Sequence, residues 1–351
     1  MLVLARVAMG NREAAGAVDD AERTIEAVLS IAVGAGGVSW QKSGSSATLL
    51  DGRTASNSMG AHLGSRPHFE DKYGIRATHS VLADVSERLN AAMNDTPMPD
   101  YLVEALLALR EAGMANHRDV HFYGARAVTP RFSMALQDHA MELIASFGSI
   151  GAAQLATALE KDETDWVFMQ RLLTGVMAPF DASQDGLSDP GERQVLERTI
   201  SRFDGESRVV SLHKAVDLRE EILGLPMTAL ARADLTAAME VLSRPRKEAQ
   251  LLGSIRDDVR RIRERHRRVR NAVNHGNPLT TAALESVRGF AERTSRAALN
   301  MALNSYASKK SLPTLIDAGE SARRAQEQGR TNGQSFIARN PPVDGTNSGE
   351  R

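Results

Sequence analysis

The stretch LLGSIRDDVRRIRERHRRVRNAVNHGNP, residues 251–278, decides the fold class of this chain. Its apolar side chains recur at three- and four-residue spacing and are Ile255, Val259, Ile262, Val269 and Val273. His266 takes the one place in this repeat where another apolar residue is expected. Gly276 and Pro278 end the pattern, because glycine suits the left-handed residue just past a helix and proline cannot continue one. The stretch therefore predicts a long amphipathic helix with one buried seam.

The same predicted helix carries a strong local positive charge. It holds eight arginines, which are Arg256, Arg260, Arg261, Arg263, Arg265, Arg267, Arg268 and Arg270. Only three acidic residues, Asp257, Asp258 and Glu264, oppose them, so the stretch has a net charge of about +5 while the whole chain has −1. A polyanion is the natural partner of such a helix. The three-four rhythm of Arg260, Arg263 and Arg267 leads toward the helix end, and we expect these three to contact nucleic-acid phosphates.

The last turns of this helix read Arg270-Asn271-Ala272-Val273-Asn274-His275-Gly276. This run resembles the R-N-x-x-x-H signature of HEPN domains (higher eukaryotes and prokaryotes nucleotide-binding), which are helical bundles, many of them metal-independent ribonucleases. The bare Arg-x4-His spacing also occurs at Arg208–His213 and at Arg261–His266. Only the run at residues 270–276 has Asn after the arginine, Gly after the histidine and a long helix before it. The resemblance covers roughly residues 190–307.

The resemblance implies an endoribonuclease that needs no metal and no cofactor. RNA supplies its own nucleophile in the 2′-hydroxyl, so His275 would move protons and Arg270 would hold phosphate oxygens. Asn271 would orient His275 or the phosphate through its amide. In this family two such motifs usually meet across a two-fold axis, so we expect a homodimer that binds RNA, with the seam that carries His266 as its interface. The family's usual roles are those of a toxin or an anti-phage defence effector.

Two further readings stay open. Arg270 and His275 could merely cap the carbonyls of a solvated helix end, and the basic helix could belong to a non-catalytic nucleic-acid-binding or scaffold protein. Some family toxins carry a tyrosine two residues after the histidine, where this chain has Asn277. We therefore favour a stand-alone ribonuclease and leave open a regulatory or sensor partner acting through the N-terminal half.

Composition sets the remaining limits. The chain has 351 residues, 42% of them hydrophobic, and no cysteine. The absence of cysteine removes disulfides, thiolate nucleophiles and Cys-ligated zinc. The opening MLVLARVAMG is interrupted by Arg6 and is too short to span a membrane, so we expect a cytoplasmic protein without a membrane partner.

The rest of the chain reads as all-α, with no readable strand. Helical periodicity appears at residues 2–33, 80–93, 99–112, 131–180, 190–203, 212–223, 227–242 and 281–307. The Gly- and Ser-rich segment 34–78 reads as a long loop, and its histidines have no metal spacing. His117 and His121 have a helical metal-ligand spacing but lack the acidic residue of a zinc protease motif, so we expect no metal site.

Three regions follow from this reading. Residues 1–185 form a helical region of unknown role, residues 186–307 a HEPN-like helical bundle, and residues 308–351 a flexible tail that is poor in apolar residues. The boundary lies in the acidic, turn-rich run DASQDGLSDPGE, residues 181–192. Pro190 in this run is placed to occupy the first position of a new helix.

Overall fold

The structure is a computed structural model that describes residues 45–48, 54–57, 87–89, 91–93, 95–114, 130–181, 190–204 and 207–341. The expected helix at residues 2–33, most of the expected loop at 34–78, and the pair His117 and His121 lie outside these residues.

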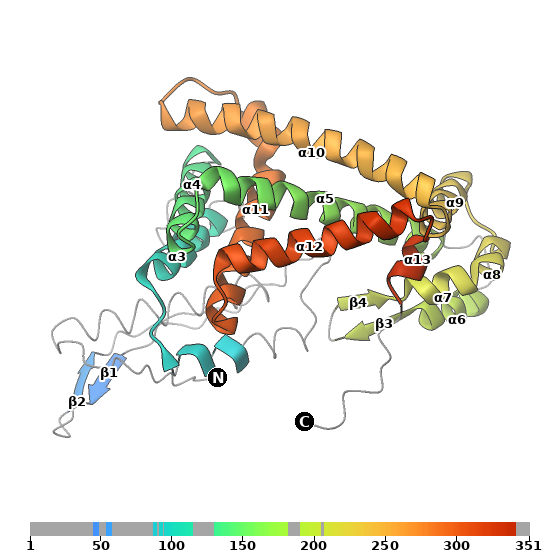
Figure 1. Cartoon of the computed structure of the whole chain (residues 1–351), viewed down its shortest axis with the longest axis horizontal. Helices are drawn as coiled ribbons and strands as arrows, with labels where there is room; N and C mark the ends of the chain where they lie inside the picture. The colour runs from blue at the N-terminus through green and yellow to red at the C-terminus, as the bar shows by residue number, and fades with distance from the viewer. Residues whose placement is uncertain are drawn as a thin grey trace. The chain divides into compact units, whose positions relative to one another are not determined.

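The predicted all-α fold class is confirmed (Figure 1). The helices are α3 (Asp100–Met114), α4 (Pro130–Phe147), α5 (Ala152–Met177), the 3-10 turn η1 (Ala178–Phe180), α6 (Pro190–Ile200), α7 (Leu212–Asp217), α8 (Arg219–Gly224), α9 (Ala229–Ser243), α10 (Pro245–Asn274), α11 (Thr281–Ser308), α12 (Leu312–Thr331) and α13 (Phe336–Arg339). Helix α6 begins at Pro190 as predicted. The expected single helix at 212–223 is instead two helices that meet at Leu218.

Four short strands correct the expectation that the chain has none. They form two antiparallel hairpins, β1 (Ser45–Thr48) with β2 (Thr54–Asn57) and β3 (Ser201–Asp204) with β4 (Ser207–Val210). Phe203, expected on the face of α6, therefore lies in β3. The residues between β3 and β4 are Gly205 and Glu206, and glycine at the first place of a two-residue connection is a hairpin signal that the helical reading overlooked.

The chain divides into two compact units that are each discontinuous in sequence. One comprises Met1–Leu159 with Arg263–Leu315, and the other comprises Glu160–Ile262 with Ile316–Arg351. This division differs from the predicted regions, because the long helices α5, α10 and α12 each contribute residues to both units. The segment 186–307, expected to be one bundle, is shared between the two units.

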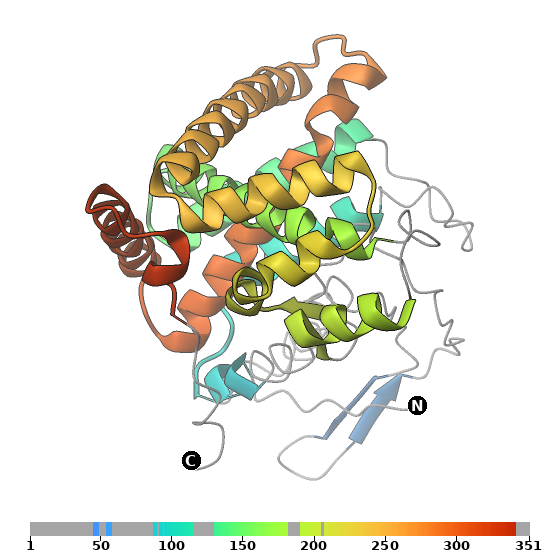
Figure 2. The same cartoon turned by 90° about the vertical axis from the view of Figure 1, so that its right-hand side faces the viewer.

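In the first unit, α3, α4 and α11 pack together with the last turns of α10. A cluster of Met134, Val269, Leu284 and Val287 forms the apolar contact among α4, α10 and α11. Burial of such aliphatic side chains contributes about 1.5–3 kcal/mol each. Figure 2 shows α10 turning back into α11 through a short connection. The motif is thus contacted by α4, which lies in the half of the sequence outside the family resemblance.

In the second unit, α5 packs closely on α9 at a glycine. A Cβ atom added to Gly175 would lie 2.8 Å from the Cβ of Ala238 and 2.9 Å from the carbonyl oxygen of Asp234. The absence of a side chain at Gly175 therefore permits this close approach. Leu172, Leu235 and Met239 are fully buried beside it along the same two helices. This is an ordinary helix-on-helix core.

The predicted flexible tail is wrong for its described part, residues 308–341, because it contains α12 and α13. Charge pairs hold α12 where apolar contacts are few. Arg323 pairs with Asp162 and with Asp165, the latter at 2.7 Å, and Lys161 pairs with Glu320. The prediction of a flexible tail relied on apolar periodicity, which does not detect a helix that ion pairs hold in place.

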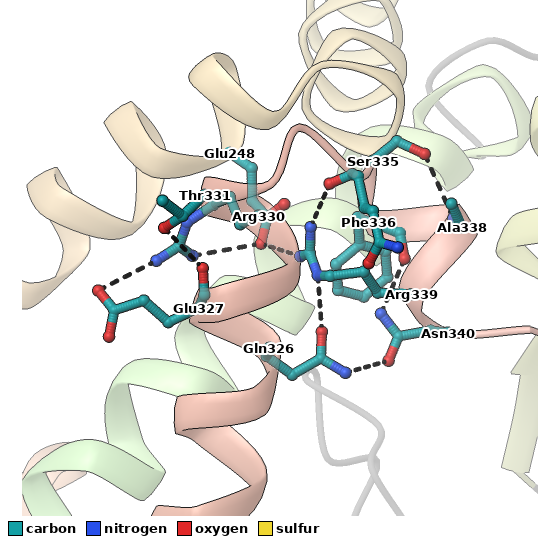
Figure 3. Close-up of polar contacts among 11 residues, drawn as sticks. Glu248, Gln326, Glu327, Arg330, Thr331, Ser335, Phe336, Ala338, Arg339 and Asn340 are labelled. Atoms are coloured by element: carbon teal, nitrogen blue, oxygen red, sulfur yellow. Dashed lines mark hydrogen bonds and ion pairs between the residues drawn. The ribbon is translucent and has the colours of Figure 1, made fainter.

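A buried carboxylate anchors the end of this segment (Figure 3). Glu248, whose side chain is 3% exposed, lies 2.5 Å from Arg339 and 3.4 Å from Arg330. Arg339 also donates to Gln326 at 2.9 Å, and Phe336 lies 5.7 Å from Phe168 between ring centroids. The first turn of α10 thereby holds both arginines of the C-terminal segment.

Among the described residues, no single helix has the length and apolar character of a membrane span, and the bent pair α4–α5 meets those two criteria only when both helices are counted together.

Glu248→Ala should lower the free energy of unfolding by about 3–5 kcal/mol, because it leaves the buried charge of Arg339 without its partner. The matched control is Glu327→Ala. Glu327 pairs with the same Arg330 at 3.6 Å but is 65% exposed, so its loss should cost less than about 1 kcal/mol. Urea unfolding of both variants measures the difference, and equal stabilities would contradict the assigned role of Glu248.

Candidate functional site

The end of α10 has the geometry that its sequence predicts. Gly276 is left-handed with φ of 70°. The amide of Asn277 donates to the carbonyl of Ala272 at 2.9 Å, and the amide of Gly276 donates to that of Val273 at 3.2 Å. These two bonds form a Schellman motif, which satisfies carbonyls that a helix end otherwise leaves open. His275 is therefore the last residue before a sharp change of direction.

Helix α4 holds this end of α10 through the backbone. The guanidinium of Arg131 donates to the carbonyls of Ala272 and Val273, both at 3.4 Å. A cation at this position also complements the negative end of the helix dipole. The open alternative that Arg270 and His275 cap these carbonyls is wrong for the side chain of Arg270, which points to carboxylates of α4 instead.

A single carboxylate joins two side chains of the motif. Asp138 places Oδ1 2.5 Å from Nε of Arg270, and its Oδ2 accepts from the amide of Asn274 at 3.0 Å. Arg270 and Asn274 are one turn apart on α10, so one residue of α4 can reach both. Glu142, one turn beyond Asp138, accepts from Nη2 of Arg270 at 3.2 Å. The side chain of Arg270 is 33% exposed, because α4 covers part of it.

His275 and Asn271 occupy a different side of the helix end. Both are exposed, and within the described part of the chain neither side chain has a hydrogen-bond partner. Helical geometry separates residues 270 and 275 by about 140° around the axis, because each residue turns about 100°. Within a single chain the three motif side chains therefore do not point to one place. Arg270 faces α4, whereas His275 and Asn271 face solvent.

The arginines of α10 are largely exposed along its length. Arg260 and Arg267 are exposed, and Arg263 is half-buried with a partner of its own. Arg260 lies 3.7 Å from Asp257, and Arg261 pairs with Asp258, each within the helix. Exposed pairs of this kind are weak and leave the arginines available to phosphates.

His266 completes the apolar seam inside the chain. Its ring packs edge-on against Phe290 of α11 with 5.5 Å between centroids. Burial lowers the pKa of His266 below the usual 6.5, with Arg270 acting in the same direction and Asp138 opposing both. The seam that we expected to serve as a dimer interface is thus filled by the protein's own α11.

The sequence reasoning missed Asp138, Glu142 and Arg131. Their signal in the sequence is a spacing of seven and four residues along one face of a helix, but nothing local connects them to α10. Asp138 and Glu142 contact the motif from α4, whereas the acidic residues that the sequence places nearest to it lie on α10 itself. Within the described ranges, no group of three or more His, Asp or Glu side chains could hold a metal ion.

Comparison of the chain with protein-family models, with curated proteins and with solved structures gives no match. The resemblance to HEPN domains therefore rests on the motif residues of the sequence alone.

The buried imidazole of His266 should make stability depend on pH. Its pKa is lower in the folded chain than the usual 6.5, so on acidification the unfolded chain takes up a proton before the folded chain does. The stabilising contribution is complete above about pH 6.5 and is lost as pH falls toward the folded-state pKa. Urea unfolding at about pH 7.5 and about pH 5 should therefore show a larger loss for wild type than for His266→Leu. The same loss in both proteins would contradict the assignment.

Proposed function

We propose that the chain is a metal-independent endoribonuclease of the HEPN type. The observation that supports this most is the exposed His275, held by a Schellman motif directly after a basic helix and free of hydrogen bonds to the described residues. The Schellman motif fixes the backbone at this position, and an accessible imidazole suits proton transfer to and from a bound substrate.

In the proposed reaction the 2′-hydroxyl of RNA attacks the neighbouring phosphate. His275 takes up or delivers protons during this attack. Arg270 stabilises the charge that develops on the phosphate oxygens, through the part of its guanidinium that α4 does not hold. Asn271, exposed beside His275, would contact the phosphate or the imidazole. The products would be a 2′,3′-cyclic phosphate and a 5′-hydroxyl.

Arg260, Arg263 and Arg267 would bind the RNA backbone. All lie on α10, and their spacing places them on one side of a helix. Phosphate contacts of this kind release counterions, so binding should weaken steeply as salt rises.

The proposal includes a homodimer. Arg270 and His275 diverge within one chain, so a site in which the arginine of one protomer meets the histidine of its partner would bring the two groups together. Such an interface would use the exposed side of the last turns of α10, since the seam is filled by α11. A role as a toxin or defence effector, with regulation through the N-terminal half, follows from the family resemblance.

A non-catalytic nucleic-acid-binding protein is the second candidate. The ion pair of Arg270 with Asp138 favours it, because an arginine engaged by a carboxylate has fewer donors left for a reacting phosphate. The two candidates share the basic helix and differ in the need for His275.

His275→Ala should abolish cleavage of single-stranded RNA, by a factor of at least about 100 for loss of an acid–base group. Far-UV helicity and the melting temperature should not change, since the side chain is exposed. The matched control is His139→Ala, which removes an exposed imidazole from α4 outside the motif. Gel assays of purified proteins measure the rates, and full activity in His275→Ala would favour the binding-protein candidate. Arg270→Ala is a less clean test, because it also removes the partner of Asp138.

Cleavage should proceed in EDTA and should require the 2′-hydroxyl. The proposed attack uses the nucleophile of the substrate, and Asp138 and Glu142 are engaged with Arg270 rather than grouped as ligands. RNA with one deoxyribose at the scissile position should resist cutting there while its other positions are cleaved. If a chelator inhibits cleavage, or if RNA is cut at the deoxyribose, residues other than Arg270 and His275 must catalyse the reaction.

A further inference from the structure

The two carboxylates that contact Arg270 are in very different environments. The side chain of Asp138 is 11% exposed, and both of its oxygens have partners on α10. The side chain of Glu142 is 56% exposed, and its one polar partner among the described residues is Nη2 of Arg270, at 3.2 Å. The partly exposed arginine thus has one nearly buried partner and one solvated partner.

The buried partner sets the direction of the guanidinium. Nε of Arg270 is completely buried and makes no hydrogen bond to the described residues, but Oδ1 of Asp138 lies 2.5 Å away as the partner of an ion pair. The other oxygen of Asp138 is held by Asn274, so the carboxylate cannot rotate without losing a contact. Helix α4 is itself fixed to the same helix end by Arg131. These contacts leave Arg270 little freedom at its Nε side.

The solvated partner occupies a position that a phosphate would use. Carboxylates and phosphates bind the same N–H donors of a guanidinium. An exposed ion pair contributes little to stability and exchanges readily with other anions. Within the part of the chain that the structure describes, Nη1 of Arg270 has no partner, so a phosphate that displaced Glu142 could take donors from both Nη1 and Nη2.

We propose that α4 places two carboxylates of opposite effect on Arg270: Asp138 is a positioning residue that fixes the guanidinium, and Glu142 is a built-in competitor that RNA phosphate must displace. This inference rests on the proposed function, because it assigns Arg270 to phosphate. It deepens that proposal by naming a regulatory element of the same site. The competition sets a threshold, so that a weakly held polyanion does not engage Arg270.

Binding measurements separate the two roles by sign. The probe is a fluorescein-labelled, 2′-O-methylated single-stranded RNA, which cannot be cleaved by 2′-hydroxyl attack. Glu142→Gln should tighten binding about two- to five-fold, the size expected when an exposed ion pair no longer competes. Asp138→Asn should weaken binding, although it also removes a negative charge. An amide has only one acceptor oxygen, so asparagine cannot serve both Arg270 and Asn274, and its NH2 group would face one of their donors.

The matched control is Asp95→Asn. Asp95 is an exposed carboxylate in the same unit, 2.6 Å from Lys309, which directly follows the last residue of α11. Leu284, near the opposite end of α11, packs against Val269 beside the site. The roughly 25 residues between Leu284 and Lys309 correspond to about 37 Å of helix, so Asp95 lies far from the site. Asp95→Asn removes the same single negative charge as Asp138→Asn or Glu142→Gln, but it should leave RNA binding unchanged.

Several results would overturn the inference. Equal tightening of RNA binding by Asp138→Asn and Glu142→Gln would show a general effect of charge. If Glu142→Gln bound RNA no more tightly than Asp95→Asn, the role of Glu142 as a competitor would be contradicted. Failure of wild type to bind the probe at low salt would also overturn it. If Asp138→Asn does not fold, Asn274→Ala tests the positioning role through the other partner of Asp138, and unchanged binding would contradict it.

Cleavage assays distinguish this inference from the proposed function. With unmodified RNA, Asp138→Asn should lower kcat, whereas Glu142→Gln should mainly lower KM. A wild type that binds the probe with the predicted pattern but cuts no RNA would refute the ribonuclease and retain the competition at Arg270. If cleavage depends on His275 but the Asp138 and Glu142 variants do not change binding in opposite directions, the ribonuclease is retained and the competition at Arg270 is refuted.

Discussion

The carboxylate of Asp138 is the interaction on which the arrangement of the motif depends. One oxygen faces Arg270 and the other accepts from Asn274, so a single side chain of α4 fixes two positions on the last turns of α10. Because this carboxylate is nearly buried, its charge must be matched, and Arg270 supplies the matching charge. The direction of Arg270 follows from this requirement.

This pairing separates the motif into two sides. Arg270 and Asn274 face α4, while Asn271 and His275 remain exposed beyond them. A helix end held in this way has an accessible imidazole on one side and a partly engaged guanidinium on another. In the proposed ribonuclease, the anion that holds the remaining donors of Arg270 would control phosphate binding, and in the structure that anion is the solvated Glu142.

Charge also organises the C-terminal segment of the second unit. Arg323 pairs with Asp162 and Asp165, and Arg330 and Arg339 meet at Glu248. These helices have few apolar residues to bury, so specific ion pairs replace the apolar stripe that marks most packed helices. The pair of Glu248 with Arg339 is costly to break singly, because the remaining partner stays buried.

The sequence by itself determined the features that depend on neighbours a few residues away. These are the helical class, the seam of α10, its end at Gly276 and the start of α6 at Pro190, all of which follow from local periodicity and backbone preference. Only the tertiary structure decided that Arg270 meets Asp138 and that the tail is helical. Contacts between residues more than 100 positions apart depend on which helices pack together, and no local preference records that choice.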